Sequence, residues 1–257
     1  MCLKNESKER RTVREIVRAS YAAIALDKPN ASCCSVACCG GAFDHAALAK
    51  AVGYDAESLR NLPEGANMGL SCGNPVAIAA LRPGQIVLDL GSGGGFDVFQ
   101  AGEKVGETGR VIGVDMTPEM IDKARRNIEQ YRQRANLDNV EFRLGEIEHL
   151  PVQDASIDVV LSNCVLNLSP DKPQVWREIF RVLKLGGRVA MSDMALLRPL
   201  PPKAAAMAEA LAGCVAGAVL VEEMRTILEE TGFQAVKLTP KPDYVRHMLE
   251  WNDPLYR

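Results

Sequence analysis

QIVLDLGSGGG, residues 85–95, is the stretch that decides the fold of this chain. It begins with an apolar run, Ile86 to Leu88, of the kind that forms a buried strand. Asp89 closes the run, and a glycine-rich turn leads into an apolar helical pattern. Because glycine has no Cβ, this turn can bend sharply and bring its backbone into contact with a ligand. The stretch therefore predicts a strand, a ligand cradle and a helix, in that order.

The spacing of the glycines separates two cofactor classes. The dinucleotide fingerprint G-x-G-x-x-G requires glycine at position 96, and the residue there is Phe96. A second apolar strand, residues 110–115, ends in Asp115, whose carboxylate can accept both hydroxyls of a ribose. This combination favours a class I methyltransferase over a dehydrogenase.

Strand and helix patterns alternate from residue 85 onward, which indicates a parallel sheet covered on both faces. We expect further strands at 140–144, 157–162, 188–192 and 234–238, and helices at 7–27, 44–52, 119–135, 171–184 and, in two parts, 203–231. Gly186 and Gly187 should end the helix at 171–184. The predicted class is α/β, a Rossmann-like mostly parallel sheet, with an N-terminal helical and cysteine-rich lid (1–75), a cofactor-binding core (76–200) and a helical C-terminal segment (201–257).

Composition narrows the range of partners. The 257 residues carry 30 basic and 33 acidic side chains, a formal net charge of -3, which gives no sign of binding to nucleic acid or to an anionic membrane. The amino end is charged where a secretory signal needs an apolar run, and no stretch of 18 apolar residues occurs. We expect a cytoplasmic monomer with no nucleic-acid or membrane partner.

Eight cysteines are a large number for a protein kept in a reducing compartment, where they suggest metal binding or chemistry. Cys72 precedes the first strand, Cys164 lies two residues after the strand at 157–162, and Cys214 follows the strand at 188–192. Ligands of open α/β sheets bind beyond the carboxyl ends of the strands, so these three thiols can meet beside the cradle. The alternative for each is a small buried hydrophobe.

Four other cysteines lie close together in ASCCSVACCGG, residues 31–41: Cys33, Cys34, Cys38 and Cys39. A zinc knuckle is one interpretation, although structural zinc prefers two separated C-x₂₋₄-C pairs. The vicinal thiols of Cys33 and Cys34 can also form disulfides by exchange.

Six stretches together resemble one known family over about residues 63–233: DLGSGGGFDVF, VIGVDMTPEMIDKAR, EFRLGEIEHLP, SNCVLNLSPDK, RVLKLGGRVAMSD and GCVAGA. They are similar to the arsenite S-adenosylmethionine methyltransferases in their bacterial form. The resemblance implies S-adenosylmethionine as cofactor, arsenite or methylated arsenite as substrate, and Cys72, Cys164 and Cys214 as the arsenic(III) ligands. It also implies an upstream relay cysteine, for which we favour Cys33 or Cys34, and a thiol reductant such as glutathione or thioredoxin.

The same resemblance implies cofactor contacts along the cradle and the strands beside it. Gly91, Ser92, Gly93 and Gly95 would line the amino-acid moiety, Asp115 the ribose, Met116 and Ile147 the adenine faces, Glu146 its edge, and Asn163 the methionine end. Asp89 would brace the glycine loop or touch the cofactor. Tyr21-Ala22 stands where the family often shows Tyr-Gly, which leaves the role of Tyr21 open.

The chemistry needs no general base, because the lone pair of arsenic would attack an already activated methyl group. Soft thiolates select a soft trivalent centre. Vicinal thiols would then return two electrons by forming a disulfide with a core cysteine. Two alternatives stay open: methylation of another small molecule, such as a quinone or sterol, and a non-catalytic thiol-based binder of soft ions or redox sensor.

Overall fold

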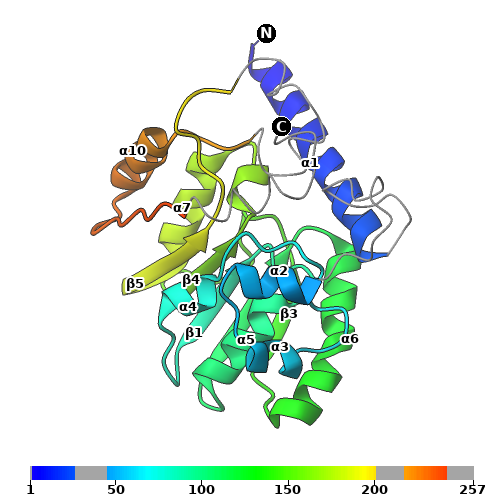
Figure 1. Ribbon diagram of the computed structural model, residues 1–257. Coiled ribbons are helices and arrows are strands. Elements are labelled where there is room, and N and C mark those ends of the chain that lie inside the picture. The colour runs from blue at the N-terminus through cyan, green and yellow to red at the C-terminus, as the bar shows by residue number, and fades with distance from the viewer. Residues whose placement is uncertain (1, 27–44, 201–216, 242–257) are drawn as a thin grey trace.

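The computed structural model describes residues 2–26, 45–200 and 217–241 (Figure 1). A five-stranded parallel sheet with the order β3-β2-β1-β4-β5 forms its centre. The strands are β1 (Ile86–Leu90), β2 (Arg110–Asp115), β3 (Val140–Leu144), β4 (Ile157–Asn163) and β5 (Leu183–Ser192). The strand order reverses between β1 and β4, so the carboxyl ends of these strands flank the crevice where α/β sheets bind ligands.

Helices cover both faces of the sheet, as the near-continuous apolar strands require. Val87 and Val159 face a core cluster completed by α2 (His45–Ala51), α3 (Ala56–Asn61), α4 (Pro75–Ala79), α5 (Phe96–Val105) and α6 (Pro118–Ala135). Leu88 and Val160 face the opposite cluster, to which α7 (Lys172–Val182) and α10 (Val221–Thr231) contribute. The alternation of side chains along each strand therefore builds two cores from one sheet.

The long first helix, α1 (Cys2–Ala25), packs against α6. Its buried Val17 joins a small apolar cluster with Leu168, against which Tyr21, Met116 and Cys164 pack. Leu168 belongs to a short 3₁₀ turn, η2 (Leu166–Leu168), that directly follows β4. The amino-terminal helix thus lies over the carboxyl edge of the sheet. Within the described ranges, no helix is long and apolar enough to cross a membrane.

The predicted fold class is confirmed, and β2 and β3 have the predicted bounds. Two local predictions are wrong. The helix at 171–184 ends at Val182 rather than at the glycine pair, because Leu183 already pairs with Ile157 and β5 runs through Gly186 and Gly187. Residues 234–238 form no strand; Phe233, just before them, packs its ring on Trp176 and Phe180 at centroid distances of 5.5 and 5.4 Å.

Candidate functional site

The glycine cradle joins β1 to α5. Gly91, Gly93 and Gly95 have φ angles of +67°, +50° and +94°, a region that disfavours side chains. A Cβ on Gly91 would lie 2.4 Å from Val165 Cγ2, and one on Gly95 would lie 2.5 Å from Phe99 Cε2. The amides of Gly91 and Ser92 donate to Val114 O at 2.8 and 3.0 Å. The turn is therefore held against β2 and has no room for side chains at these two glycines.

Three carboxylates surround the cradle. Asp115, at the end of β2, accepts hydrogen bonds from Gly93 N at 3.0 Å and Thr117 N at 2.8 Å. Asp89 and Asp97 are buried. Burial raises the pKa of all three, and for Asp89 the charges of Asp97 and Asp115 raise the pKa further. Such a cluster favours a ligand that brings positive charge.

An open cavity lies beside the cradle, with about 1020 Å³ of empty space including the part that opens to solvent. Eight of the ten predicted cofactor residues line it: Asp89, Gly91, Ser92, Gly93, Asp115, Met116, Ile147 and Asn163. Val17 and Tyr21 of α1 line it too. The hydroxyl of Ser92 is buried and has no hydrogen-bond partner in the part of the chain that the structure describes. A bound ligand with a polar group would satisfy it.

The other two predicted residues do not line the cavity. Gly95 begins α5 and faces the rings of Phe99 and Phe142. Glu146 pairs with Arg18 at 3.2 Å and with Arg14 at 3.6 Å, both on α1. Arg14 also pairs with Glu148 at 3.1 Å. These acids therefore fix the amino-terminal helix over the site.

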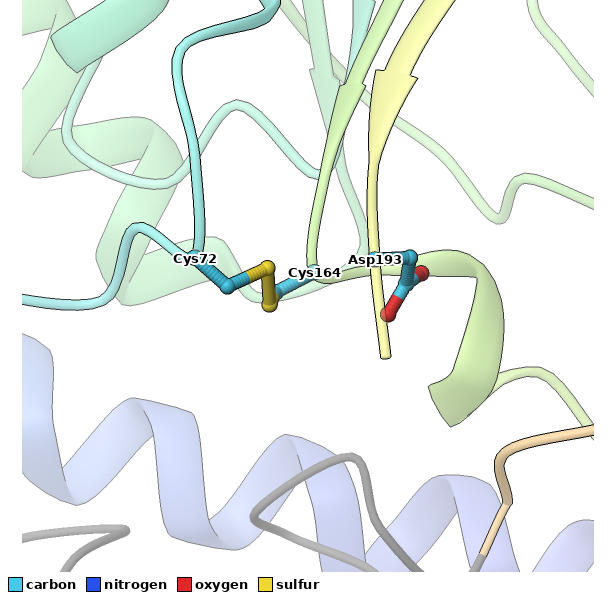
Figure 2. A group of neighbouring side chains, drawn as sticks. All are labelled: Cys72, Cys164 and Asp193. Atoms are coloured by element: carbon cyan, nitrogen blue, oxygen red, sulfur yellow. A yellow bond between two sulfur atoms is a disulfide. The ribbon is translucent and has the colours of Figure 1, made fainter. Parts of the chain in front are cut away.

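Two of the predicted thiol residues meet at the rim of this cavity. Cys72 and Cys164 are 92 positions apart in the sequence, yet their Cα atoms are 5.9 Å apart and their sulfur atoms form a disulfide (Figure 2). Cys164 lines the cavity and has a φ of +56°, a conformation uncommon for a residue other than glycine. Cys33, Cys34, Cys38, Cys39 and Cys214 lie outside the described residues.

Asn163 links the thiol rim to the cradle. Its Oδ1 accepts from Cys72 N at 3.0 Å, and its Nδ2 lies 3.0 Å from both Gly73 O and Asp97 Oδ2. On the far side, Ser192 Oγ donates to Cys72 O at 3.0 Å, while Cys164 N donates to Ser192 O at 2.9 Å. The ends of β4 and β5 therefore place both cysteines.

Tyr54 and Asp97 complete this network. Tyr54 Oη donates to Asp97 Oδ1 at 2.6 Å and accepts from Asn163 Nδ2 at 3.1 Å. Burial raises the pKa of Asp97 to about 6, although the hydrogen bonds from Tyr54 and Asn163 act in the opposite direction. Burial and the Asp97 charge raise the pKa of Tyr54, so its hydroxyl stays a donor. Sequence reasoning missed both residues; the position of Asp97 just after the cradle was the available signal.

A third missed residue, Asp193, follows β5 beside the two sulfur atoms (Figure 2). Its Oδ1 accepts from Asn167 Nδ2 at 2.7 Å and from Met194 N at 2.8 Å. The residue as a whole is half-buried, but its carboxylate is surrounded by protein. This burial raises the pKa of Asp193 to about 7. Its place at the carboxyl end of a predicted strand was the signal that could have marked it.

Comparison with known proteins agrees with this architecture. Residues 81–232 match the family model described as "Methyltransferase domain". An arsenite methyltransferase of Halobacterium salinarum is 46% identical over 248 residues, which cover 93% of this chain and 62% of that protein. The crystal structure of an arsenic (III) S-adenosylmethionine methyltransferase from Chlamydomonas reinhardtii has 37% sequence identity and a TM-score of 0.60, covering 72% of this chain and 61% of that one.

A shorter similarity reaches a different kind of methyltransferase. A demethylmenaquinone methyltransferase of Lactococcus lactis is 40% identical over 106 residues, 41% of this chain and 40% of that protein. The chain spans less than two thirds of the length of the arsenite methyltransferases described above. Since the family model matches more than half of the sequence, the chain belongs to the methyltransferase domain family.

Proposed function

We propose that this chain transfers methyl groups from S-adenosylmethionine to trivalent arsenic bound by cysteine thiolates. One observation carries the proposal: Cys72 and Cys164, 92 positions apart, join their sulfur atoms at the rim of a cavity built on a glycine cradle. The printed activities of the Halobacterium and Chlamydomonas proteins support the same assignment.

The cradle fits S-adenosylmethionine. The cofactor carries a sulfonium and an ammonium group, which suit a cavity lined by Asp89, Asp97 and Asp115. Ser92 offers an unsatisfied hydroxyl, and Asp115 keeps lone pairs for the ribose. Met116 and Ile147 would contact adenine, and Asn163 would lie at the methionine end. Gly95 and Glu146 would act indirectly, by starting α5 and by anchoring α1. When bound, the cofactor supplies an activated methyl group.

The thiolates would hold the substrate. Thiolates of Cys72 and Cys164, with Cys214 as the third ligand, would replace the hydroxides of arsenite and leave the arsenic lone pair free. The protein then needs to place arsenic in line with the donor, and such positioning can lower a barrier by about 7–11 kcal/mol at best. Tyr21 and Val17 of α1 line the same cavity and would help exclude water from it.

Electrons must return to the product, because transfer of a methyl cation to the lone pair oxidises arsenic by two electrons. Two thiols can supply this pair by forming a disulfide, and Cys72 and Cys164 are close enough to form one. Cys33 or Cys34 would carry the disulfide outward by exchange, and glutathione or thioredoxin would reopen it. We further propose that the chain acts as a monomer. Its proposed location is the cytoplasm, because that reducing compartment keeps these thiols free.

The test is incubation of the reduced chain with arsenite, S-adenosylmethionine and a thiol, followed by speciation of the arsenic products. We expect methylated arsenic from the wild type and at most traces from Cys72→Ser, Cys164→Ser or Cys214→Ser. Equal product from all four proteins would overturn the role of the thiols. If the chain does not bind S-adenosylmethionine, the remaining interpretation is a thiol-based binder of soft ions or a redox sensor.

The similarity to a quinone methyltransferase favours a second candidate, an organic acceptor methylated from the same cradle. Such a reaction needs a base aimed at carbon or oxygen and has no use for two thiols. Methylation of a demethylmenaquinone analogue that survives the double change Cys72→Ser and Cys164→Ser would establish this candidate.

A further inference from the structure

We propose that Cys72 and Cys164, when reduced, form with Asp193 a binding site for a divalent cation of the zinc class. Their three donor atoms, two Sγ and one carboxylate oxygen, all lie within 4.8 Å of one another. They come from three separate places, the loop before α4, the residue after β4 and the residue after β5 (Figure 2). The site shares its two sulfurs with the proposed arsenic site, but its formation needs neither arsenic nor S-adenosylmethionine.

The donor set matches the preferences of zinc. Zinc binds thiolate sulfur at about 2.3 Å and carboxylate oxygen at about 2.0–2.2 Å in tetrahedral geometry, so neighbouring ligand atoms lie about 3.5–3.8 Å apart. On reduction the two sulfurs, bonded to each other in the disulfide, must separate to this spacing. The carboxylate oxygen, which lies within 4.8 Å of both, needs to approach them by at most about 1.3 Å. Magnesium and calcium select oxygen ligands, so two sulfurs exclude them. Three protein ligands leave the fourth position open to water.

The surroundings of the site hold the ligands in place, as second-shell groups do around metals. Asn167 Nδ2 and Met194 N fix Asp193 Oδ1, while Oδ2 accepts a longer hydrogen bond of 3.4 Å from Asn167 N. Oδ2 therefore keeps the greater freedom to coordinate a cation.

The redox state of the thiols would control this site, because only thiolates coordinate the cation. A phosphine reductant opens the disulfide with one water, giving two thiols and a phosphine oxide, and each thiol releases its proton when it binds metal. The cation would compete with arsenic for the two sulfurs. Arsenic(III) can be held by sulfur alone, whereas the cation also uses the carboxylate, so a change at Asp193 separates the two ligands.

The experiment is a Co²⁺ titration of the phosphine-reduced chain, residues 1–257, with Cys33, Cys34, Cys38 and Cys39 changed to serine so that the vicinal thiols do not bind. Thiolate-to-cobalt charge-transfer absorption reports sulfur coordination, and Zn²⁺ should displace the cobalt. We expect one cobalt per chain. Asp193→Asn should weaken binding at least about tenfold, and Cys72→Ser or Cys164→Ser should each reduce the absorption per cobalt.

The matched control is Asp154→Asn. Asp154 precedes β4 at the opposite edge of the sheet, its side chain is 74% exposed, and it pairs with Arg181. This variant should titrate like the parent. A second control needs no substitution: the oxidised parent, with the Cys72–Cys164 disulfide closed, should lose the charge-transfer band. Thermal unfolding of each variant shows whether the fold is kept.

Two results would overturn the site. If Asp193→Asn binds cobalt as tightly as the parent, the carboxylate is not a ligand. If the oxidised parent gives the same absorption as the reduced parent, the two thiols are not ligands either. Neither readout depends on arsenic methylation, so a failed cation site leaves the proposed function in place, and a failed methylation assay leaves the cation site in place.

Discussion

The glycine cradle and the thiol rim lie side by side at the carboxyl edge of the sheet, yet they are built in opposite ways. The cradle is local: residues 85–95 carry the strand, the acid and the glycines that form it. The rim is assembled from Cys72 and Cys164, which only the fold brings together across 92 positions. A local motif reveals the cofactor class, while the substrate site depends on tertiary structure.

Asn163 is the point where the two regions join. Its amide contacts Asp97 beside the cradle and the backbone of Cys72 and Gly73 at the rim. Changes on either side of Asn163 should therefore separate cofactor binding from substrate binding, and changes within its network should affect both.

The largest expected effect comes from a substitution that removes a thiol of the rim and leaves the cradle intact. Cys164→Ser should lower arsenic methylation by at least about 100-fold, because even a small misplacement of a reacting atom can cost that much. Affinity for S-adenosylmethionine, measured by calorimetry, should change by less than about twofold, since serine is close to cysteine in size and the cradle is held by backbone hydrogen bonds to Val114 O. Asp154→Asn, at the opposite edge of the sheet, serves as the control and should retain full activity. Parallel losses of affinity and rate in Cys164→Ser would show that the two regions are not separable.

The next largest effect is expected from a substitution within the cradle, which should lower both stability and cofactor affinity. Gly91→Ala places a Cβ 2.4 Å from Val165 Cγ2, whereas Gly106→Ala, at the same φ of +67°, meets no atom within 4 Å. Both variants carry a backbone cost, which is about 1–3 kcal/mol for Gly106, whose ψ of -170° lies in a region that almost only glycine adopts. Only Gly91→Ala is also overpacked, which should lower the free energy of unfolding by about 1–3 kcal/mol more. We expect it to weaken cofactor binding about tenfold or more. If Gly91→Ala and Gly106→Ala bind S-adenosylmethionine with similar affinity, the cradle is not the cofactor site.

The third effect is on the pH dependence of cofactor binding. A cationic ligand prefers the ionised form of Asp97, whose pKa burial raises to about 6. Affinity for S-adenosylmethionine should therefore fall as the pH drops through about 6, by at most about tenfold per pH unit for this one group. Asp97→Asn removes that titration and should flatten the profile, which calorimetry at several pH values would measure. An unchanged profile in Asp97→Asn would assign the dependence to Asp89 or Asp115.

The smallest effect concerns Tyr54. Tyr54→Phe removes the 2.6 Å hydrogen bond to Asp97 Oδ1, and that bond lowers the pKa of Asp97. The midpoint of the pH profile should therefore move upward, and the free energy of unfolding should fall by about 0.5–1.5 kcal/mol. Urea denaturation and the same calorimetric series provide both readouts. A loss of stability without a shifted midpoint would limit Tyr54 to a structural role.

The sequence predicted what depends on local pattern. The alternation of strand and helix patterns along the chain predicted β2 and β3 with their observed bounds, and the glycine spacing identified the cradle. Glycine pairs often end helices, but β5 pairs with β4 at Leu183 and again at Arg188, on either side of Gly186 and Gly187, and this tertiary pairing outweighs the local signal. Asp193 and Tyr54 were missed because their importance depends on neighbours far away in sequence.

The central claim is that arsenic binds the sulfurs of Cys72 and Cys164 beside the cofactor cavity. Anomalous scattering at the arsenic absorption edge, from crystals of the reduced chain grown with arsenite and S-adenosylhomocysteine, tests it most directly. The account predicts an arsenic peak within bonding distance of both sulfurs. A strong arsenic peak elsewhere in the chain, with Cys72 and Cys164 unoccupied, would contradict it.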